Sequence, residues 1–380
     1  MALCLAIGAN LVASPILLYL AVFFAVLPPL ALIAVWVPRR SGTVSRRVST
    51  DLLTVSETSQ VTIRFALRSL RVPHALWHDV LPDAVSGDAG GEYPPESGIL
   101  QYRITGVRRG VWAVGPLMLR TLDPFGLAQR EQEFGETRTV TVVPEVQALA
   151  PLTARVGAAG GTAHTSATRL GQGADNLSPR FYVPGDSMRR IHWRATAHRG
   201  QLMVRQEEEE SSPDAVVVLD RSSARWAAPT EAADPAFESA VSMCASAAIH
   251  LADEGYGVDV IDSAGALLGT LRGHEDDRDG LLAALALVTP RGASRDVASL
   301  IGGTPPGPLV YITGMLGEDD ADALRSAGAA APILLATAPE ANALAAAARH
   351  GWSGARLGDD LAVAWSDALP ERMGAPDVPR

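Results

Sequence analysis

One run of residues organises this chain: RFYVPGDSMRRIHWRATAHRGQLMVRQEEEE, from Arg180 to Glu210. Its Pro184-Gly185 pair predicts a turn, because proline presets φ and glycine tolerates positive φ. Asp186 is then placed to cap a short helix that carries the arginines and Trp193. Gly200 is placed to end that helix in the left-handed conformation. The run therefore predicts a turn followed by one short, strongly basic helix.

Two strands are predicted after this helix. Gln201–Gln206 alternates polar and apolar residues, which is typical of a half-buried strand. Four glutamates follow, and Ala215–Leu219 is then a continuous apolar run that ends at Asp220. Such a run indicates a parallel strand that is buried on both faces.

The basic helix admits two compatible interpretations. Its arginines can pair with the glutamates at 207–210, because guanidinium groups suit bidentate pairing with carboxylates. We therefore predict that Arg189, Arg194 and Arg199 hold the bodies on either side together. The other interpretation is an interaction surface for another protein. A nucleic-acid site is disfavoured, since the net charge of -10 and the adjacent glutamates oppose phosphate binding.

Residues along this run resemble the signature of a family of bacterial membrane proteins called domain of unknown function 58. The matching positions are Tyr182, Pro184, Gly185, Asp186, Arg189, Ile191, His192, Trp193, Arg194, Thr196, Ala197, Arg199, Leu202, Val204 and Glu208. A second block, with Arg109-Gly110, Gly115-Pro116-Leu117 and Asp123–Leu127, resembles the end of the β-rich region of the same family. The likeness extends over nearly the whole chain.

The resemblance implies partners and not an activity. Proteins of this kind resemble partners of MoxR-type AAA+ ATPases, often alongside a membrane transglutaminase-like protein. The candidate interaction residues are those of the signature itself: Pro184, Gly185, Asp186, Arg189, His192, Trp193, Arg194 and Arg199. The ATPase would be a separate chain, because this one carries no nucleotide-binding motif.

The N-terminus is apolar enough for a lipid bilayer. No charged residue occurs from Ala2 to Val37, and Leu17–Val37 alone is long enough to span, since about 20 residues suffice. Asn10 and Ser14-Pro15 divide the run into a short helix and a full one, which matches the transmembrane hairpin that the resemblance implies. Arg39, Arg40, Arg46 and Arg47 follow, and positive residues flanking a span stay in the cytoplasm. We therefore expect an integral protein of the cell membrane, with its soluble bodies on the cytoplasmic side.

The next region predicts a β-sandwich, because short alternating runs are separated by turn formers. The expected strands are 44–48, 61–67, 75–80, 99–105, 111–114, 118–121 and 137–143. Arg108-Arg109-Gly110 predicts a hairpin turn between two of them, and Asp123 predicts a capped turn, with Phe125 closing the edge of the sandwich.

The C-terminal region alternates strands and helices, which predicts a doubly wound α/β domain. Its best-defined helix is 235–253, where Asp234 is the N-cap, Pro235 the first helical residue and Gly255 follows the end. The predicted organisation is a transmembrane hairpin (1–38), a β-sandwich (43–148), a linker (149–178), the signature segment (179–210) and an α/β domain (211–380).

Asp220 follows the first strand of that domain, where ligands bind in open α/β sheets. Together with Ser222 it resembles the Asp-x-Ser-x-Ser ion motif of the von Willebrand factor A fold, but Ala224 replaces the second serine. At a later strand end, Ile312-Thr313-Gly314 stands where an aspartate would complete the site. Because Mg²⁺ needs several oxygen ligands, we expect a vestigial metal site that binds Mg²⁺ weakly at most. No other cofactor is expected.

The resemblance, taken with the organisation of the chain, implies a membrane-anchored, non-enzymatic adaptor with a von Willebrand A-like domain, working with an AAA+ ATPase on a protein complex. The alternative is a metal-dependent enzyme with a site near Asp186, His192 and Asp220. His192 and His198 do not favour it, since a spacing of six places them on different faces of a helix.

Overall fold

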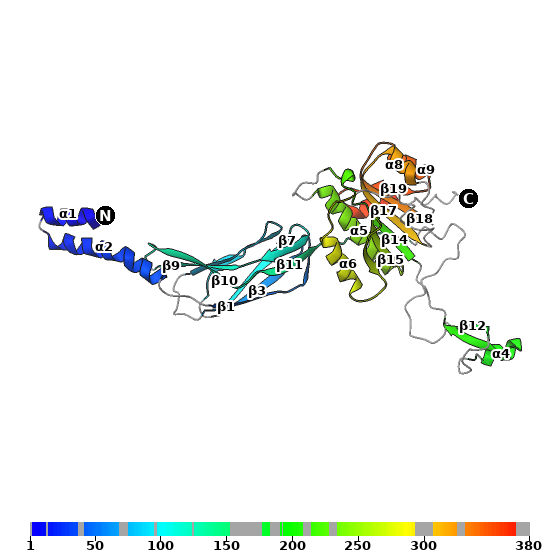
Figure 1. Cartoon of the computed structure of the whole chain (residues 1–380), viewed down its shortest axis with the longest axis horizontal. Helices are drawn as coiled ribbons and strands as arrows, with labels where there is room; N and C mark the ends of the chain where they lie inside the picture. The colour runs from blue at the N-terminus through cyan, green and yellow to red at the C-terminus, as the bar shows by residue number, and fades with distance from the viewer. Residues whose placement is uncertain are drawn as a thin grey trace, which may run out of the picture.

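The computed structural model describes thirteen stretches of the chain: 2–12, 14–36, 42–67, 75–94, 97–123, 125–152, 177–182, 191, 193–207, 214–227, 234–292, 307–324 and 331–369. Figure 1 shows a pair of helices, then an elongated β-sandwich, then an α/β body, with a small hairpin unit drawn apart from both.

Two helices form at the N-terminus, α1 (Ala2–Val12) and α2 (Pro15–Trp36), and they pack against each other. Pro15 opens α2, where its missing N–H costs no hydrogen bond. The segment Pro15–Ile33 is the one helix of the described residues that is long and apolar enough to cross a membrane. The shorter α1 is apolar as well.

The sandwich contains eleven strands, arranged in three groups with the orders β1-β3-β7-β5, β10-β9-β4-β6 and β2-β11-β8. Their bounds are β1 (Gly42–Val48), β2 (Leu52–Thr54), β3 (Thr58–Leu67), β4 (Ala75–Asp79), β5 (Val85–Gly87), β6 (Gly90–Glu92), β7 (Ile99–Gly106), β8 (Gly110–Val114), β9 (Leu117–Leu122), β10 (Gln129–Phe134) and β11 (Arg138–Val143). Alternation places one side of each strand inside: Val61 and Ile63 of β3 are fully buried. The sandwich-like region predicted from the alternation is therefore present.

Two local predictions in the sandwich are wrong. Residues 108–110 do not form a hairpin turn, because β7 pairs with β3 and β5 whereas β8 pairs with β11. The loop instead crosses from one sheet to another. Phe125 does not close the sandwich edge, since it is 60% exposed. Asp123 does cap its turn, and accepts hydrogen bonds from the N–H groups of Phe125 and Ala128.

Arg46 lies inside the sandwich and not among free charges flanking the membrane. Its guanidinium pairs with the buried carboxylate of Asp79, with Nε 2.9 Å from Oδ2, and Nη1 donates to Glu136 O. The hydroxyl of Tyr102 donates to the same carboxylate. Burial and this contact raise the pKa of Tyr102 well above its ordinary range. A buried arginine is tolerated here because a carboxylate and a carbonyl satisfy its donors.

The α/β body is built on a six-stranded sheet with the order β16-β15-β14-β17-β18-β19. All neighbouring pairs are parallel except β15 and β16. The strands are β14 (Asp214–Leu219), β15 (Gly257–Asp262), β16 (Leu267–Leu271), β17 (Pro308–Leu316), β18 (Ala331–Pro339) and β19 (Ser353–Arg356). The helices are α5 (Pro235–Asp253), α6 (Asp277–Ala286), α8 (Glu318–Ala323), α9 (Ala343–Arg349) and α10 (Leu361–Ala368).

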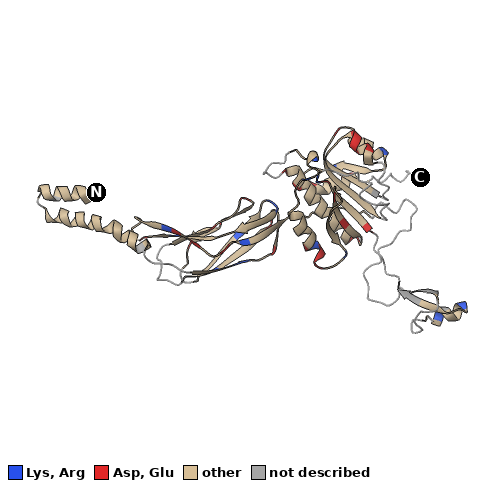
Figure 2. Cartoon of the chain, viewed as in Figure 1, with Lys and Arg blue, Asp and Glu red and all other residues tan. Residues whose placement is uncertain are grey.

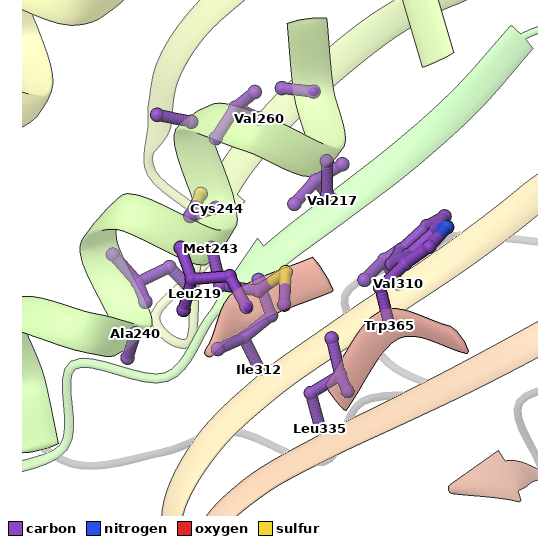
Figure 3. Packing of buried hydrophobic residues seen from close by; sticks show 14 of the residues in the cluster. Val217, Leu219, Ala240, Met243, Cys244, Val260, Val310, Ile312, Leu335 and Trp365 are labelled. Carbon is purple, nitrogen blue, oxygen red and sulfur yellow. The ribbon is translucent and has the colours of Figure 1, made fainter. Parts of the chain in front are cut away.

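Helices cover both faces of this sheet. One core joins α5, α6 and α10 to the face that carries Val217 and Leu219 of β14. Figure 3 shows these two side chains beside Met243 and Cys244 of α5 and Trp365 of α10. A second core joins α8 and α9 to the face that carries Val218. The predicted doubly wound arrangement is thus the one observed.

Residues at the start of the predicted linker (149–178) pack against the α/β body. Leu149 and Leu152 are buried in the core beneath α5 and α10. Trp365 Nε1 donates to Ala150 O at 2.8 Å, and Ser246 Oγ accepts from Gln147 N at 3.0 Å. The chain therefore contacts the α/β body directly after β11.

The signature segment forms a hairpin of β12 (Leu177–Phe181) and β13 (Met203–Glu207), with helix α4 (Trp193–Arg199) between the strands. Ile191 forms an isolated antiparallel bridge with Val204 and lies outside α4, which begins at Trp193. Gly200 ends α4 with φ +69°, in the predicted left-handed conformation.

Candidate functional site

Asp220 is the best-positioned polar side chain of the α/β body, at the carboxyl end of the central strand β14, and it is fully buried. Its Oδ2 accepts from the hydroxyls of Tyr311 at 2.7 Å and Thr313 at 3.1 Å. Its Oδ1 accepts from Ser222 N at 2.9 Å. Both carboxylate oxygens are therefore engaged by donors of the protein itself.

A guanidinium lies beside this carboxylate. Arg225 ends the 3-10 turn η2 (Ser223–Arg225), and its Nε is 3.7 Å from Asp220 Oδ2. Its Nη2 donates to Asp320 Oδ1 at 2.6 Å, and Nη1 contacts the other oxygen of Asp320. These hydrogen bonds raise the pKa of Arg225 and hold the pKa of Asp320 below its usual range, against the opposite effect of burial on each. A fixed positive charge thus connects two carboxylates.

The backbone fills one of the three positions, 312–314, where a further acidic ligand was considered. A Cβ added to Gly314 of β17 would lie 2.0 Å from Arg225 O, closer than any side chain can approach. Only glycine fits here, and it lets η2 pack directly on β17. An aspartate at 314 is therefore excluded by the path of the chain.

Asp220 and Ser222 could still offer oxygen atoms to an ion. However, the residues described contain no group of three or more His, Cys, Asp or Glu side chains arranged for metal binding. Ser222 is itself buried, and its backbone N–H is directed at Asp220. What the arrangement does chemically is satisfy both carboxylate oxygens of Asp220 with donors of the protein itself.

Arg221 stabilises the neighbouring part of this edge. Its guanidinium donates to Thr289 O at 2.9 and 3.0 Å and pairs with Asp262 at 3.1 Å. Burial, aided by the charges of Arg291 and Arg109, lowers the pKa of Arg221 although Asp262 raises it. The end of β14 and the end of α6 are joined in this way.

Arg109 attaches the sandwich to the same edge. It projects from the loop between β7 and β8, and its Nε donates to Leu285 O at 3.2 Å near the end of α6. Its Nη2 donates to Val288 O, and it forms an ion pair with Glu238 in the first turn of α5. Burial lowers the pKa of Arg109, although Glu238 raises it.

Aromatic contacts continue from this junction to the candidate site. The guanidinium of Arg109 lies 5.2 Å from the ring centre of Phe237, which meets Trp226 edge to face at 4.9 Å. Trp226 Nε1 in turn donates to the backbone oxygen of Asp220 at 3.1 Å. The sandwich and Asp220 are therefore connected by direct contacts.

The signature residues are only partly described. Trp193 of α4 is 68% exposed, and Arg194 and Arg199 are exposed as well. The structure does not place these two arginines between the bodies, where they were predicted. Pro184, Gly185, Asp186, Arg189, His192 and Glu208–Glu210 lie outside the described residues. The constellation of Asp186, His192 and Asp220 proposed for an enzyme is accordingly not seen together.

A hollow of about 620 Å³ lies at the opposite edge of the sheet, between the starts of β14 and α6. Arg272 in its wall pairs with Asp214 at 2.8 Å and Asp259 at 2.7 Å. Asp277 accepts from the N–H groups of Arg272 and His274, which hold the pKa of that carboxyl below its usual range. Because these charges are paired internally, the hollow does not present an obvious reactive group.

Three residues of this region were not predicted from the sequence to take part in it: Arg109, Arg225 and Asp320. The signal for Arg225 was its place five residues after Asp220, at the ligand-binding edge of the sheet. Arg109 carried a weaker signal, a charged residue in a block that resembles a known family. No local pattern pointed to Asp320, which lies 95 residues from its partner.

Known proteins resemble parts of this chain. Residues 178–334 match the family described as "Protein of unknown function DUF58". The "Uncharacterized protein YeaD" of Bacillus subtilis (strain 168) is 27% identical over 238 residues, which are 59% of this chain and 57% of that protein. The chain thus covers little more than half the length of this curated relative.

Solved structures resemble shorter parts. The CARDB domain of the PF1109 protein of Pyrococcus furiosus has a TM-score of 0.20 and 14% identity, covering 27% of this chain and 93% of that one. A conjugative transposon lipoprotein of Bacteroides eggerthii has a TM-score of 0.17 and 13% identity, covering 24% and 93%. Over residues 178–334, the chain is therefore similar to the DUF58 family, as the residues from Tyr182 to Glu208 led us to expect.

Proposed function

We propose that this chain is a membrane-anchored, non-enzymatic adaptor whose α/β body is a von Willebrand A-like domain with its ion replaced by a guanidinium. The observation that carries the proposal is the environment of Asp220, which is buried, hydrogen-bonded by three protein donors and 3.7 Å from Arg225 Nε. A site arranged in this way holds charge without a reactive or open coordination position.

Three features support the likeness to the von Willebrand A fold. Asp220 and Ser222 stand at the carboxyl end of β14, which lies in the middle of the sheet between β15 and β17. Helices cover both faces of that sheet. Arg225 supplies a positive charge one residue after Ala224, which stands where the Asp-x-Ser-x-Ser motif has its second serine.

Membrane attachment through α2 belongs to the same proposal. The segment Pro15–Ile33 is apolar and only 11% of it is buried within the protein, as expected of a helix that packs against lipid. Arg39, Arg40 and Arg47 follow it and favour a cytoplasmic body. Protease added outside intact cells should leave the sandwich and the α/β body undigested. Digestion of both bodies would refute this orientation.

The partners proposed are a MoxR-type AAA+ ATPase and a membrane transglutaminase-like protein. The support is the resemblance of the signature segment, in which Trp193, Arg194 and Arg199 are exposed and so accessible to another protein. The full chain, tagged and extracted from its native membrane, should retain the ATPase, and a variant with Trp193→Ala and Arg194→Ala should retain less. Equal recovery of the ATPase with the parent and with the variant would show that these residues are not part of the interface. Recovery of no ATPase with the parent would contradict the partnership.

The replacement of the ion by Arg225 has its own test. Calorimetric titration of the full chain in detergent with Mg²⁺ should give no saturable binding up to millimolar concentration. Removing the guanidinium by Arg225→Ala leaves Asp220 and Asp320 unneutralised, so Mg²⁺ should raise the thermal midpoint of that variant and not of the parent. Micromolar binding by the parent, abolished by Asp220→Ala, would favour the metal-dependent alternative.

A further inference from the structure

The outward face of the sheet β1-β3-β7-β5 is basic and carries no acidic residue within its strands. Arg47 of β1, Arg64 of β3 and Arg103 of β7 are all exposed on it. The other outward side chains are mainly hydroxyls and amides, namely Thr43, Ser45, Thr58, Gln60, Thr62, Gln101, Thr105 and Ser86, together with Ala66 and Ile99. In a chain with a net charge of -10, this face is a local exception.

The three arginines are not neutralised by neighbouring carboxylates. Within the described part of the chain, none of them forms an ion pair, in contrast to Arg46 on the inner side of β1, which pairs with Asp79. Acidic residues flank these strands in sequence, among them Asp51, Glu57 and Asp88, and all three lie outside the strands. Exposed guanidinium groups that form no ion pair can bind an anion.

The face is also hollowed. A depression of about 320 Å³ is lined by Arg47, Arg64 and the short polar side chains between them. A second, of about 380 Å³, continues from Arg64 toward Gly98. Short serine and threonine side chains between long arginines leave this room, and their hydroxyls can donate hydrogen bonds.

The register sets the spacing of the positive charges. Arg64 lies opposite Ser45, and Arg47 lies opposite Thr62. The two arginines are therefore on neighbouring strands, in successive rows of outward side chains. Arg103 lies opposite Gln60, one further row along β3. Successive rows are about 7 Å apart, which is also the distance between alternate side chains of an extended chain. Carboxylates at alternate positions of an extended segment match these rows.

We propose that this basic face, defined by Arg47, Arg64 and Arg103, binds an extended acidic segment of a partner protein. The inference deepens the adaptor function proposed above by naming the chemistry of a partner. Nucleic acid is disfavoured because the face has no aromatic side chain on which a base could stack. A lipid surface is disfavoured because the strands run from the end of α2 toward the α/β body, so the face extends away from the anchor (Figure 1).

The test uses the full chain in detergent and a fluorescent peptide in which glutamate alternates with threonine. Fluorescence anisotropy should show binding that weakens with added salt. The variant with Arg47→Gln, Arg64→Gln and Arg103→Gln should bind at least tenfold more weakly. A control with Arg138→Gln, Arg349→Gln and Arg356→Gln removes the same charge from exposed positions elsewhere and should bind within twofold of the parent. Figure 2 colours the arginines of the described part of the chain blue.

Three outcomes would overturn the proposal. One is equally weakened peptide binding by the face variant and the control variant, which would show that binding depends on net charge alone. Another is loss of binding to phosphatidylserine vesicles by the face variant while peptide binding is unchanged, which would assign the face to lipid. A third is tighter peptide binding by a chain with Glu207–Glu210 changed to glutamine, which would assign the face to the acidic run of the chain itself. The peptide assay contains no ATPase, so its failure is distinguishable from failure of the proposed partnership.

Discussion

Two arginine-bearing regions of this protein differ in what surrounds them. Arg109, in the loop between β7 and β8, has a side chain that is 6% exposed, and it contacts Glu238, Leu285 and Val288 of the other body. Arg194 and Arg199 of α4 are exposed. The same side chain is thus a structural connector in one region and a solvated charge in the other. Burial decides the role, because a guanidinium removed from water must find all its partners within the protein.

The largest expected effect is at Arg109. Its replacement by alanine leaves Glu238 and two carbonyls without their donor at a buried junction, at a cost of about 3–5 kcal/mol in the free energy of unfolding. Denaturant unfolding of the full chain in detergent measures this. Arg108→Ala is the matched control, because the guanidinium of Arg108 stacks on Trp112 and does not cross the junction. This substitution should cost about 1 kcal/mol or less. Equal losses in the two variants would contradict the connector role.

Glu238→Gln should have a smaller effect, about 1–2 kcal/mol, because the Glu238 side chain is 31% exposed and water can replace part of the pairing. Combining it with Arg109→Ala should add little to the loss of Arg109→Ala alone. A double-mutant cycle on the unfolding free energies provides the coupling between the two residues. Fully additive losses would show that the pair does not join the bodies.

Arg225 is intermediate in burial, with its side chain 24% exposed, and its effect should depend on pH. The pKa of Asp320 is lowered from 3.8 in the folded protein, chiefly by hydrogen bonds from Arg225, so the pairing stabilises the fold above the unfolded pKa. That stability is lost as the pH falls through the lowered folded pKa. Arg225→Ala should therefore cost about 1 kcal/mol at neutral pH. Thermal midpoints measured from pH 7 to pH 3 should converge for parent and variant, and a constant difference would contradict the assignment.

The smallest effect is expected at α4. Arg194→Ala and Arg199→Ala should each change the unfolding free energy by about 0.5 kcal/mol or less, because exposed charges lose little when truncated. The thermal midpoint of the full chain checks this against Arg109→Ala. A loss as large as that of Arg109→Ala would return the junction role to the signature segment.

Local patterns predicted much of the fold. Asp234 and Pro235 indicated the start of α5, and the helix runs from Pro235 to Asp253 as expected, with Asp234 accepting a hydrogen bond from Ala236 N. The apolar run at 215–219 predicted a strand that is parallel to both of its neighbours. Short strands such as β5 (Val85–Gly87), β6 (Gly90–Glu92) and β19 (Ser353–Arg356) were not predicted, because their few residues carry too little periodicity to be recognised.

The candidate site was predicted in part. Asp220 and Ser222 were identified from their place after a strand, because the carboxyl ends of parallel strands meet at one edge. The donors that occupy Asp220 come from Tyr311 and Thr313, about 90 residues later. Nothing near Asp220 in sequence indicates which of its oxygen atoms they engage.

The sequence by itself determined the apolar α2, the alternation of the sandwich and the order of strands and helices in the α/β body, because each follows from spacing among near neighbours. Only the tertiary structure decided which arginines are buried. Arg46 was expected beside a membrane and lies within the sandwich, whereas Arg109 was expected in a hairpin turn and joins two bodies. The physical reason is that burial and charge pairing depend on groups brought together from far apart, as Arg109 and Leu285 are across 176 residues.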